Sequence, residues 1–275
     1  MSLTSRRAAL APVRAVALGF ACAVVLAGCG AQAPSPAATG GATQAAAPAD
    51  ITVFAAASLT EVFDTLGPEF EKAHGARVSF SYAGSSDLAA QLGQGAPGAV
   101  FASADEKQMR TAVENGSVAG EGARVFATNT LTAVTPSGNP AGLTSLAALA
   151  GPGVKTVVCA PQVPCGATTR KLEQAAGIDI EPVSEEQSVT DVLGKVTSGQ
   201  ADAGIVYVTD AKRAKGRVEI VDIPEATALV NRYPIAVTEF GAAEPGRRAT
   251  AEAFVAYVLG ERGRAVLQDA GFGRP

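Results

Sequence analysis

The stretch ITVFAAASLTEVFDTL (residues 51–66) places a short β-favouring run and three alanines directly before an amphipathic helix. From Leu59 onward, apolar side chains recur at helical spacing. Ser58 is followed three residues later by Glu61, which is the pattern of a capping box, so we expect Ser58 to be the N-cap of this helix. The start of a helix also presents unpaired N–H groups and the positive end of the helix dipole, so the same turn is suited to hold an anion.

Small residues at the point where a strand gives way to a helix recur along the chain. YAGSSDLAAQL (82–92) repeats the pattern with Ser85, and SVTDVL (188–193) pairs a capping serine with an aspartate three residues on. VPCGATTRKL (163–172) places a Cys-Gly turn at a helix start, and GIVYVTDA (204–211) ends a buried strand on a tyrosine. Ligands of α/β proteins bind beyond the carboxyl ends of the strands, so these turns are expected to converge.

Strands and helices alternate along the chain, which predicts an α/β fold with mostly parallel sheets flanked by helices. Strands are expected at 51–55, 77–82, 99–102, 131–135, 156–159, 203–207, 218–221 and 235–238. Helices are expected to begin near Ser58, Ser85, Glu106, Leu143, Gly166, Ser188, Thr209 and Pro245. Pro68 lies inside the first helical pattern and is expected to end or kink that helix.

Residues 1–28 have the features of a targeting segment. Three arginines precede an apolar run that ends in Leu-Ala-Gly-Cys (residues 26–29), and this run is too short to span a bilayer comfortably. The pattern resembles a bacterial lipoprotein signal, which implies cleavage before Cys29 and lipidation of its thiol. A plain secretory peptide is the alternative. We therefore expect an exported protein that a lipid anchors to the outer face of the cell membrane.

Residues 29–50 are rich in Ala, Pro, Gly, Thr and Gln with almost no large apolar side chain, which is typical of a flexible linker. Removal of residues 1–28 takes away three of the 22 basic residues and none of the 26 acidic ones, so the exported chain is acidic. An acidic exported protein is a poor candidate for binding nucleic acid. Trp is absent and aromatic residues make up 5% of the chain, which argues against a sugar site.

Two cysteines, Cys159 and Cys165, remain in the part of the chain expected to fold. In an oxidising compartment they are most simply explained as a disulfide, with a metal site as the alternative. The metal alternative lacks further ligands, because no other cysteine remains there and His74, the only histidine, lies at a predicted helix C-terminus. We therefore expect neither a bound metal cation nor a cofactor, and we assign His74 to the surface.

Seven segments, in their order and spacing, make the chain similar to a known family: ITVFAAASLTEVF, YAGSSDLAAQL, GAPGAVFASADEKQM, VPCGATTRKL, SVTDVL, GIVYVTDA and YPIAV. They resemble the molybdate-binding proteins that feed ABC importers, and the likeness covers nearly everything from Ile51 to the end. The resemblance implies the two-lobed periplasmic binding protein fold of type II. Residues 51–129 and 234–275 are then expected to form one lobe, and residues 130–233 the other.

The resemblance also implies a set of ligand contacts, which fall on Ser58, Ser85, Cys165, Val189 and Tyr207. The two serines are expected to donate hydroxyl and backbone N–H groups, the cysteine and the valine backbone N–H groups only, and the tyrosine its phenol. The chain departs from the family at Cys165, where a small residue such as alanine is common. It departs again at Gly84, where the family often has another serine.

All the expected donors are neutral, which suits molybdate because this ion is fully deprotonated at neutral pH and needs donors but no acceptor. Charge-assisted hydrogen bonds of roughly 1.5–3 kcal/mol each would offset much of its dehydration. We expect a monomeric binding protein, not an enzyme, that captures molybdate and tungstate and delivers them to the membrane permease of an ABC importer.

Three other functions are weighed against this one. A binding protein for sulfate or phosphate would share the fold, although a phosphate site would want a carboxylate to accept the proton of hydrogen phosphate. Asp87 is the one acid close to an expected contact, and its place at a helix N-terminus explains it. A secreted hydrolase would need a Gly-x-Ser-x-Gly turn and a histidine base, which the sequence around Ser58 and Ser85 does not offer. A structural lipoprotein would not need hydroxyl groups at so many strand-to-helix turns.

Overall fold

The computed structural model describes residues 47–275. The expected signal segment (1–28), the expected lipidation site Cys29 and most of the expected linker (29–50) lie outside the described residues. In the described part, no helix is both long and apolar enough to cross a membrane. Just before the first strand, the carboxylate of Asp50 pairs with the guanidinium of Arg77 at 3.0 Å.

The first of two sheets has five strands in the order β2-β1-β3-β10-β4. Its strands are β1 (Ile51–Ala56), β2 (Val78–Ala83), β3 (Val100–Ala102), β4 (Arg124–Asn129) and β10 (Asn231–Val237). β1 pairs in parallel with β2 and β3, whereas β10 runs antiparallel to β3 and to β4. Four of the strands therefore point the same way, and their carboxyl ends lie at one end of the sheet.

The second sheet repeats this plan with the order β7-β6-β8-β5-β9. Its strands are β5 (Leu131–Pro136), β6 (Thr156–Cys159), β7 (Ser184–Glu186), β8 (Ala203–Tyr207) and β9 (Val218–Val221). β6 pairs in parallel with β7 and β8, and β5 runs antiparallel to β8 and β9. In both sheets, the single antiparallel strand lies next to an edge strand.

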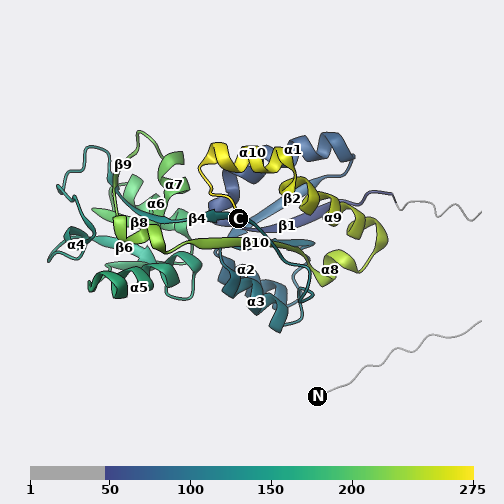
Figure 1. Ribbon diagram of the computed structural model, residues 1–275, viewed down its shortest axis with the longest axis horizontal. Helices are drawn as coiled ribbons and strands as arrows, with labels where there is room; N and C mark the ends of the chain where they lie inside the picture. The colour runs from purple at the N-terminus through teal and green to yellow at the C-terminus, as the bar shows by residue number, and fades with distance from the viewer. Residues whose placement is uncertain (1–46) are drawn as a thin grey trace, which may run out of the picture. The chain divides into compact units, whose positions relative to one another are not determined.

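The chain passes between the two sheets twice (Figure 1). β4 ends at Asn129 and β5 begins at Leu131, so the first passage needs only Thr130. The return follows β9 through a 3-10 helix, η2 (Pro224–Ala228), and enters β10 at Asn231. Asn129 and Asn231 are register partners, so the two passages lie side by side. A pair of adjacent crossing segments is suited to act as a hinge.

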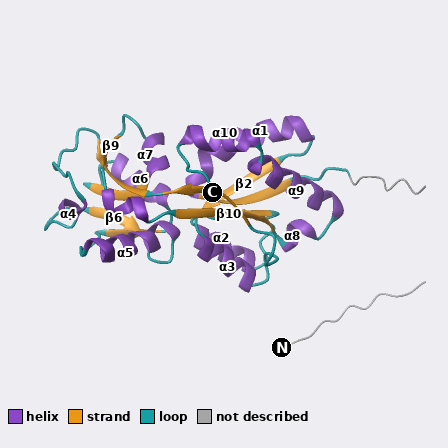
Figure 2. Cartoon of the chain, viewed as in Figure 1, coloured by secondary structure: helices purple, strands orange, loops and turns teal. Residues whose placement is uncertain are grey.

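Helices cover both faces of each sheet (Figure 2). Around the first sheet lie α1 (Thr60–His74), α2 (Ser85–Gly93), α3 (Glu106–Glu114), α8 (Glu239–Ala242), α9 (Pro245–Leu259) and α10 (Glu261–Ala270). Around the second lie α4 (Leu146–Leu149), α5 (Pro164–Ala176), α6 (Val189–Thr197) and α7 (Val208–Arg213). Six of these helices, α1, α2, α3, α5, α6 and α7, follow the end of a parallel strand, as expected of an α/β fold.

Aromatic side chains fill the core around the first sheet. Phe63, Phe70 and Phe254 are fully buried, and the ring of Phe254 meets the other two edge-on, at centroid distances of 5.6 and 5.3 Å. The core around the second sheet is aliphatic, and between residues 130 and 230 Tyr207 is the only aromatic residue. The second sheet therefore carries its single aromatic ring at the carboxyl end of β8.

The predicted α/β fold of periplasmic binding protein type is confirmed, while several boundaries differ from the prediction. The segment after β1 first forms a short 3-10 helix, η1 (Ala57–Leu59), so α1 begins at Thr60. α1 continues through Pro68, because its apolar face remains buried on both sides of the proline. Strand β7 is not predicted because its three residues are all polar, and β4, α8 and α10 are missed as well. His74 is exposed at the end of α1, as predicted.

Candidate functional site

A pocket forms where the carboxyl ends of the parallel strands of the two sheets face one another. Ser58 and Ser85 reach it from the first sheet, after β1 and β2. Cys165, Val189 and Tyr207 reach it from the second sheet, after β6, after β7 and at the end of β8. The structure thus brings all five residues expected from the sequence to one place.

The pocket is small, and its lining is uncharged. The space left for the centre of a water-sized sphere is about 10 Å³, which is the scale of one small group. The rest of the lining is small or apolar and includes Ala56, Ala83, Ala104 and Val163. Within residues 47–275, no group of three or more His, Cys, Asp or Glu side chains could hold a metal ion. A pocket of this size cannot enclose a sugar or a peptide in this conformation.

Three helices that start at the pocket lack side-chain caps. η1, α2 and α5 follow Ala56, Gly84 and Val163, none of which accepts a hydrogen bond through its side chain. By contrast, the N-cap residues of α3 and α8 are Asp105 and Thr238, and their side-chain oxygens accept hydrogen bonds from backbone N–H groups. The uncapped helices α9 and α10 start at the exposed residues of the surface, where water can bind. N–H groups left uncapped at a buried pocket need another acceptor, and an anion can supply it.

A fourth helix at the pocket, α6, is capped in a way that leaves its first N–H group to the pocket. Ser188 Oγ accepts from the N–H of Asp191 at 3.2 Å, as predicted. Val189, the first residue of α6, is buried and lines the pocket. Cys165 holds a similar place on α5, because the residue before it, Pro164, has no N–H group. These two residues carry the first N–H groups that α6 and α5 can offer to a ligand.

Ser58 is not a helix cap, which corrects the sequence prediction. It lies within η1, the N-cap position of α1 is Leu59, and no side chain caps that helix. The capping pattern with Glu61 is not realised, because the chain after β1 tightens into a 3-10 turn before α1 begins. The Ser58 hydroxyl instead lies 3.0 Å from the hydroxyl of Tyr233, which is 175 positions away in the chain.

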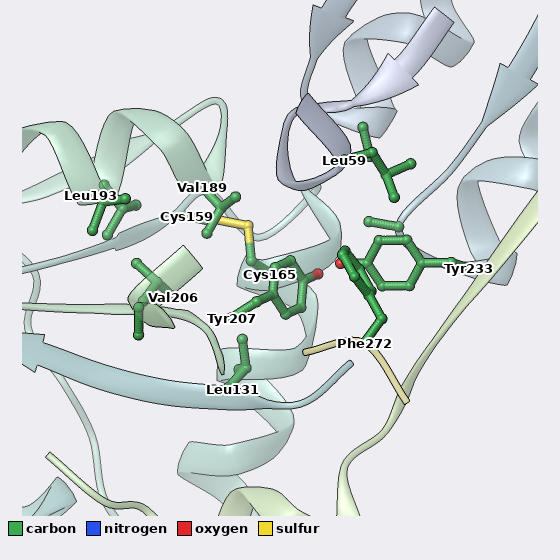
Figure 3. Close-up of a cluster of buried hydrophobic side chains, with 14 of the residues drawn as sticks. Leu59, Leu131, Cys159, Cys165, Val189, Leu193, Val206, Tyr207, Tyr233 and Phe272 are labelled. Carbon is green, nitrogen blue, oxygen red and sulfur yellow. A yellow bond between two sulfur atoms is a disulfide. The ribbon is translucent and has the colours of Figure 1, made fainter. Parts of the chain in front are cut away.

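Tyr233 is a site residue that the sequence analysis does not identify. It lies on β10, it is fully buried, and its ring packs edge-on against Phe126, Tyr207 and Phe272. Figure 3 shows the hydroxyl groups of Tyr233 and Tyr207 turned toward one another. Burial raises the pKa of Tyr233 above its ordinary value, so the phenol keeps its hydrogen and can donate it to Ser58.

The hydroxyl groups of Ser85 and Tyr207 each accept a hydrogen bond from the protein. The backbone N–H of Ala104 donates to Ser85 Oγ at 3.0 Å, and the side-chain amide of Asn231 donates to Tyr207 Oη at 3.1 Å. Burial raises the pKa of Tyr207 well above its ordinary value, so this phenol is protonated. Each of the two hydroxyl groups therefore retains a hydrogen that it can donate into the pocket.

A disulfide joins Cys159, at the end of β6, to Cys165 on α5, with 5.7 Å between their Cα atoms. The short loop between the two cysteines contains Val163 and Pro164, which line the pocket beside Cys165. The bridge ties the first turn of α5 to the end of the strand that precedes it. Because the two sulfur atoms are bonded to each other, they form no metal-binding thiolate pair in this structure.

Two acids lie close to the pocket, and the sequence analysis, which considers only Asp87, singles out neither. Asp105 caps α3, and its burial raises its pKa. The carboxylate of Asp210 lies 3.3 Å from the N–H of Tyr207 and pairs with Arg213 at 3.0 Å. Burial raises the pKa of Asp210 to about 6, against the lowering effect of Arg213. Neither carboxylate is part of the pocket lining.

Known proteins share the sequence pattern of this chain over most of its length. The family described as bacterial extracellular solute-binding protein matches residues 51–273. The molybdate-binding protein ModA of Mycobacterium tuberculosis (strain ATCC 25618 / H37Rv) is 48% identical over 263 residues, which cover 94% of this chain and 97% of that protein.

Two solved structures share the fold. The periplasmic molybdate-binding protein of Azotobacter vinelandii has a TM-score of 0.69 at 23% identity, covering 82% of this chain and 100% of that one. The sulfate-binding protein SubI of Mycobacterium tuberculosis H37Rv has a TM-score of 0.70 at 19% identity, covering 82% of this chain and 86% of that one. At these identities the two structures show the fold alone, and their TM-scores do not distinguish between the two anions.

The raised pKa of Asp210 makes the stability of the fold depend on pH. Its folded-state pKa of about 6 lies above the ordinary value of 3.8, so folding favours the protonated form. The stability that this group contributes is complete below its unfolded pKa and is lost as the pH rises through its folded pKa. Relative to Asp210→Asn, the unfolding free energy of the parent protein should fall by about 2–3 kcal/mol between roughly pH 4 and pH 7. Urea denaturation measures this difference, and a value that stays constant with pH would contradict the prediction.

Proposed function

This chain belongs to the bacterial extracellular solute-binding protein family and, within it, to the molybdate-binding proteins of ABC importers, and from that premise we propose that it captures molybdate in the pocket between its sheets. The hydroxyl groups of Ser58, Ser85 and Tyr207 and the backbone N–H groups of Cys165 and Val189 hold the ion. The protein then delivers the ion, chemically unchanged, to the membrane permease of the importer. Its role is binding and not catalysis.

The observation that carries this proposal is the donor character of the pocket. The oxygens of Ser85 and Tyr207 accept from Ala104 and Asn231, which leaves their own hydrogens for a ligand, and Ser58 shares a hydrogen bond with Tyr233 that either hydroxyl can donate. Within the described residues, no carboxylate belongs to the pocket lining. A fully deprotonated oxyanion requires such a set, because it can accept hydrogen bonds but cannot donate one.

Neutral donors can stabilise a doubly charged ion, because hydrogen bonds to a charged acceptor are about twice as strong as neutral ones. Several such bonds, at roughly 1.5–3 kcal/mol each, offset much of the dehydration cost without a buried lysine or arginine. The N-termini of α2, α5 and α6 add the positive ends of three helix dipoles at the same place.

The expected affinity of the pocket for other oxyanions depends on their charge, their size and the number of hydrogens that they carry. Tungstate has the charge and tetrahedral form of molybdate, so we propose that it binds as well. Sulfate is the second candidate, because the same donors suit it and a sulfate-binding protein shares the fold. It is smaller, so donors placed for molybdate would lie farther from its oxygens. Phosphate is disfavoured, because its dianion keeps one hydrogen and the lining holds no carboxylate to accept it.

Ligand capture would close the two sheets on the ion. In this proposal residues 51–129 and 234–275 move as one lobe and residues 130–233 as the other, about the paired passages at Asn129 and Asn231. Donors from both sheets can reach one ion only when the lobes are together, so binding favours the closed form. The closed form is then the state that the permease recognises.

Attachment to the membrane is proposed from the sequence at residues 26–29. Leu-Ala-Gly-Cys after an apolar run supports lipidation of Cys29 and a position at the outer face of the cell membrane. Residues 29–50 then link the anchor to the folded part, which binds its ligand as a monomer. Such a linker keeps the binding protein near the permease while leaving it free to turn.

Ligand selectivity tests the proposal directly. Molybdate and tungstate should each raise the melting temperature of the purified protein, and sulfate and phosphate at the same concentration should raise it far less. A ligand at 100 times its Kd adds about 2.7 kcal/mol to the unfolding free energy, which a thermal-shift assay resolves. Equal stabilisation by sulfate would contradict the molybdate assignment, and no response to any oxyanion would contradict the functional class.

Ser58→Ala tests whether Ser58, which is not a helix cap, donates to the ligand. We expect molybdate affinity, measured by isothermal titration calorimetry, to fall about tenfold or more, because a buried charged oxygen loses one donor. The matched control is Ser145→Ala, at a true N-cap serine that accepts from the N–H of Ala148. It should lower the unfolding free energy by about 1 kcal/mol and leave the affinity unchanged. Unchanged affinity in Ser58→Ala would remove this residue from the site.

The disulfide should hold the ligand loop more than the fold. With a sequence separation of 6, it removes little entropy from the unfolded chain, roughly 2 kcal/mol at most. Joint replacement by Cys159→Ala and Cys165→Ala should give a folded protein that releases molybdate faster, because the N–H at position 165 is no longer held before binding. Stopped-flow dissociation measures this rate. A thiol reductant should have the same effect on the parent protein, and a double variant that binds as tightly as the parent would refute the role.

A further inference from the structure

We propose that Asn231 is a positioning residue that keeps Tyr207 a hydrogen-bond donor to the bound anion. It thereby lowers the affinity of the pocket for anions that carry a hydrogen. This inference rests on the proposed oxyanion function. Asn231 does not line the pocket itself. It is the first residue of β10, where the chain returns from the second sheet, and its side chain is buried.

The side-chain amide of Asn231 is hydrogen-bonded to elements of both sheets. Its Nδ2 donates to the carbonyl oxygen of Ala104 at 3.2 Å and to Tyr207 Oη at 3.1 Å. Its Oδ1 accepts from Thr168 Oγ1 at 2.8 Å. Ala104 follows β3 of the first sheet, whereas Thr168 and Tyr207 lie on α5 and β8 of the second side. One buried amide therefore connects the pocket residues of the two sides.

The carbonyl group of Ala104 determines the orientation of the Asn231 amide, that is, which of Oδ1 and Nδ2 faces Tyr207. The oxygen and nitrogen of an asparagine amide are alike in shape, so their hydrogen-bond partners decide the orientation. In the reversed orientation, Oδ1 would face the Ala104 carbonyl oxygen, and two buried acceptors would oppose each other. The Thr168 hydroxyl can either donate or accept, so it permits both orientations. Ala104, whose carbonyl can only accept, therefore directs Nδ2 toward Tyr207.

The orientation of the amide decides what Tyr207 offers to a ligand. With Nδ2 as the donor, the Tyr207 oxygen accepts, and its own hydrogen is left for the ligand or, when the pocket is empty, for the facing hydroxyl of Tyr233. In the reversed arrangement the phenol would give its hydrogen to Oδ1 and present only lone pairs. Ala104 also donates its N–H to Ser85 Oγ at 3.0 Å. The two backbone groups of one residue thus direct hydroxyl groups that come from both sheets.

A pocket arranged in this way distinguishes anions by their hydrogens as well as by their charge. At about pH 8, molybdate and hydrogen phosphate are both dianions, but hydrogen phosphate keeps one hydrogen. Against a set of donors, that hydrogen has no acceptor and opposes another hydrogen. An unpaired buried polar group of this kind lowers the affinity by about tenfold or more. Asn231 contributes to this discrimination without touching either ion.

Exchange of the amide for a carboxylate tests the proposal. In Asn231→Asp, the atom that faces Tyr207 becomes an acceptor, so the phenol should turn its hydrogen away from the pocket and offer a lone pair to the ligand. The added negative charge repels both dianions alike, so the ratio of the two affinities isolates the direction of the hydrogen bond. We expect the ratio of molybdate to hydrogen phosphate affinity at about pH 8 to fall about tenfold or more, measured by calorimetry with phosphate as the competitor.

Gln108→Glu is the matched control, because it also exchanges a buried amide for a carboxylate. Gln108 is also buried, and its side-chain amide donates to the carbonyl oxygen of Gln162 at 2.9 Å, outside the pocket lining. This variant should weaken both anions by similar factors and leave their affinity ratio unchanged. Tyr207→Phe provides a second control, because Asn231→Asp made in that background has no hydroxyl to redirect and should no longer change the ratio.

Asn231→Ala covers the case in which a buried carboxylate prevents folding. It adds no charge and removes the donor to the Tyr207 oxygen, so the direction of the phenol hydrogen is no longer set and the affinity ratio should fall in the same direction. An unchanged ratio in the folded Asn231 variants, or an equal change in Gln108→Glu, would overturn the role of Asn231. If the parent protein bound no oxyanion at all, the proposed function itself would fail, so the two failures are distinguishable.

Discussion

A hydroxyl group has a single hydrogen, and the pocket can serve a bare oxyanion only if that hydrogen points into it. The structure favours this direction by placing a protein donor behind the hydroxyl oxygens of Ser85 and Tyr207 and a second hydroxyl beside Ser58. Asn231 lies behind Tyr207, and Tyr233, whose pKa is raised by burial, lies 3.0 Å from Ser58. The hydroxyl groups proposed to contact the ion can either donate or accept a hydrogen bond, so the residues behind them determine which of the two they offer. Selectivity is then set by side chains that do not touch the ligand.

The two sheets can bring these groups together because backbone meets backbone closely beside the pocket. A Cβ atom at Gly84 would lie 2.1 Å from the carbonyl oxygen of Gln187, on the opposite side. A serine, which is common at this position in the molybdate-binding proteins that the chain resembles, does not fit here without a backbone shift. Gln108 Nε2 adds a direct link between the sides by donating to the carbonyl oxygen of Gln162 at 2.9 Å. Gly84 therefore exchanges a possible hydroxyl donor for a closer approach of the two sides.

Local patterns in the sequence were enough to predict the α/β class and the cap at Ser188, whereas the family resemblance supplied the two-lobed fold and the five residues that do meet at one pocket. The prediction failed where a distant residue decides the structure. Ser58 has the local pattern of a cap, yet its hydroxyl partner, Tyr233, is 175 positions away. No local motif marks Asn231 either, because its role arises only when β10 lies beside the end of β8. One signal was readable: Tyr207 is the only aromatic residue between 130 and 230.

Because of the position of Asn231, the direction of the Tyr207 hydrogen bond depends on whether the pocket is closed. This residue stands at the return passage and bonds to Ala104 on one side and to Thr168 and Tyr207 on the other. If the sheets separate about the passages, the amide cannot keep all of these partners, and Tyr207 loses the donor that directs its hydrogen. An open pocket is therefore less able to distinguish anions by their hydrogens. A ligand shifts the equilibrium toward closure only by its differential affinity for the closed form. In the proposed closure, an anion that carries a hydrogen is thus rejected at the closing step, because the closed form is the one in which the oxygens of Ser85 and Tyr207 are both held as acceptors from the protein.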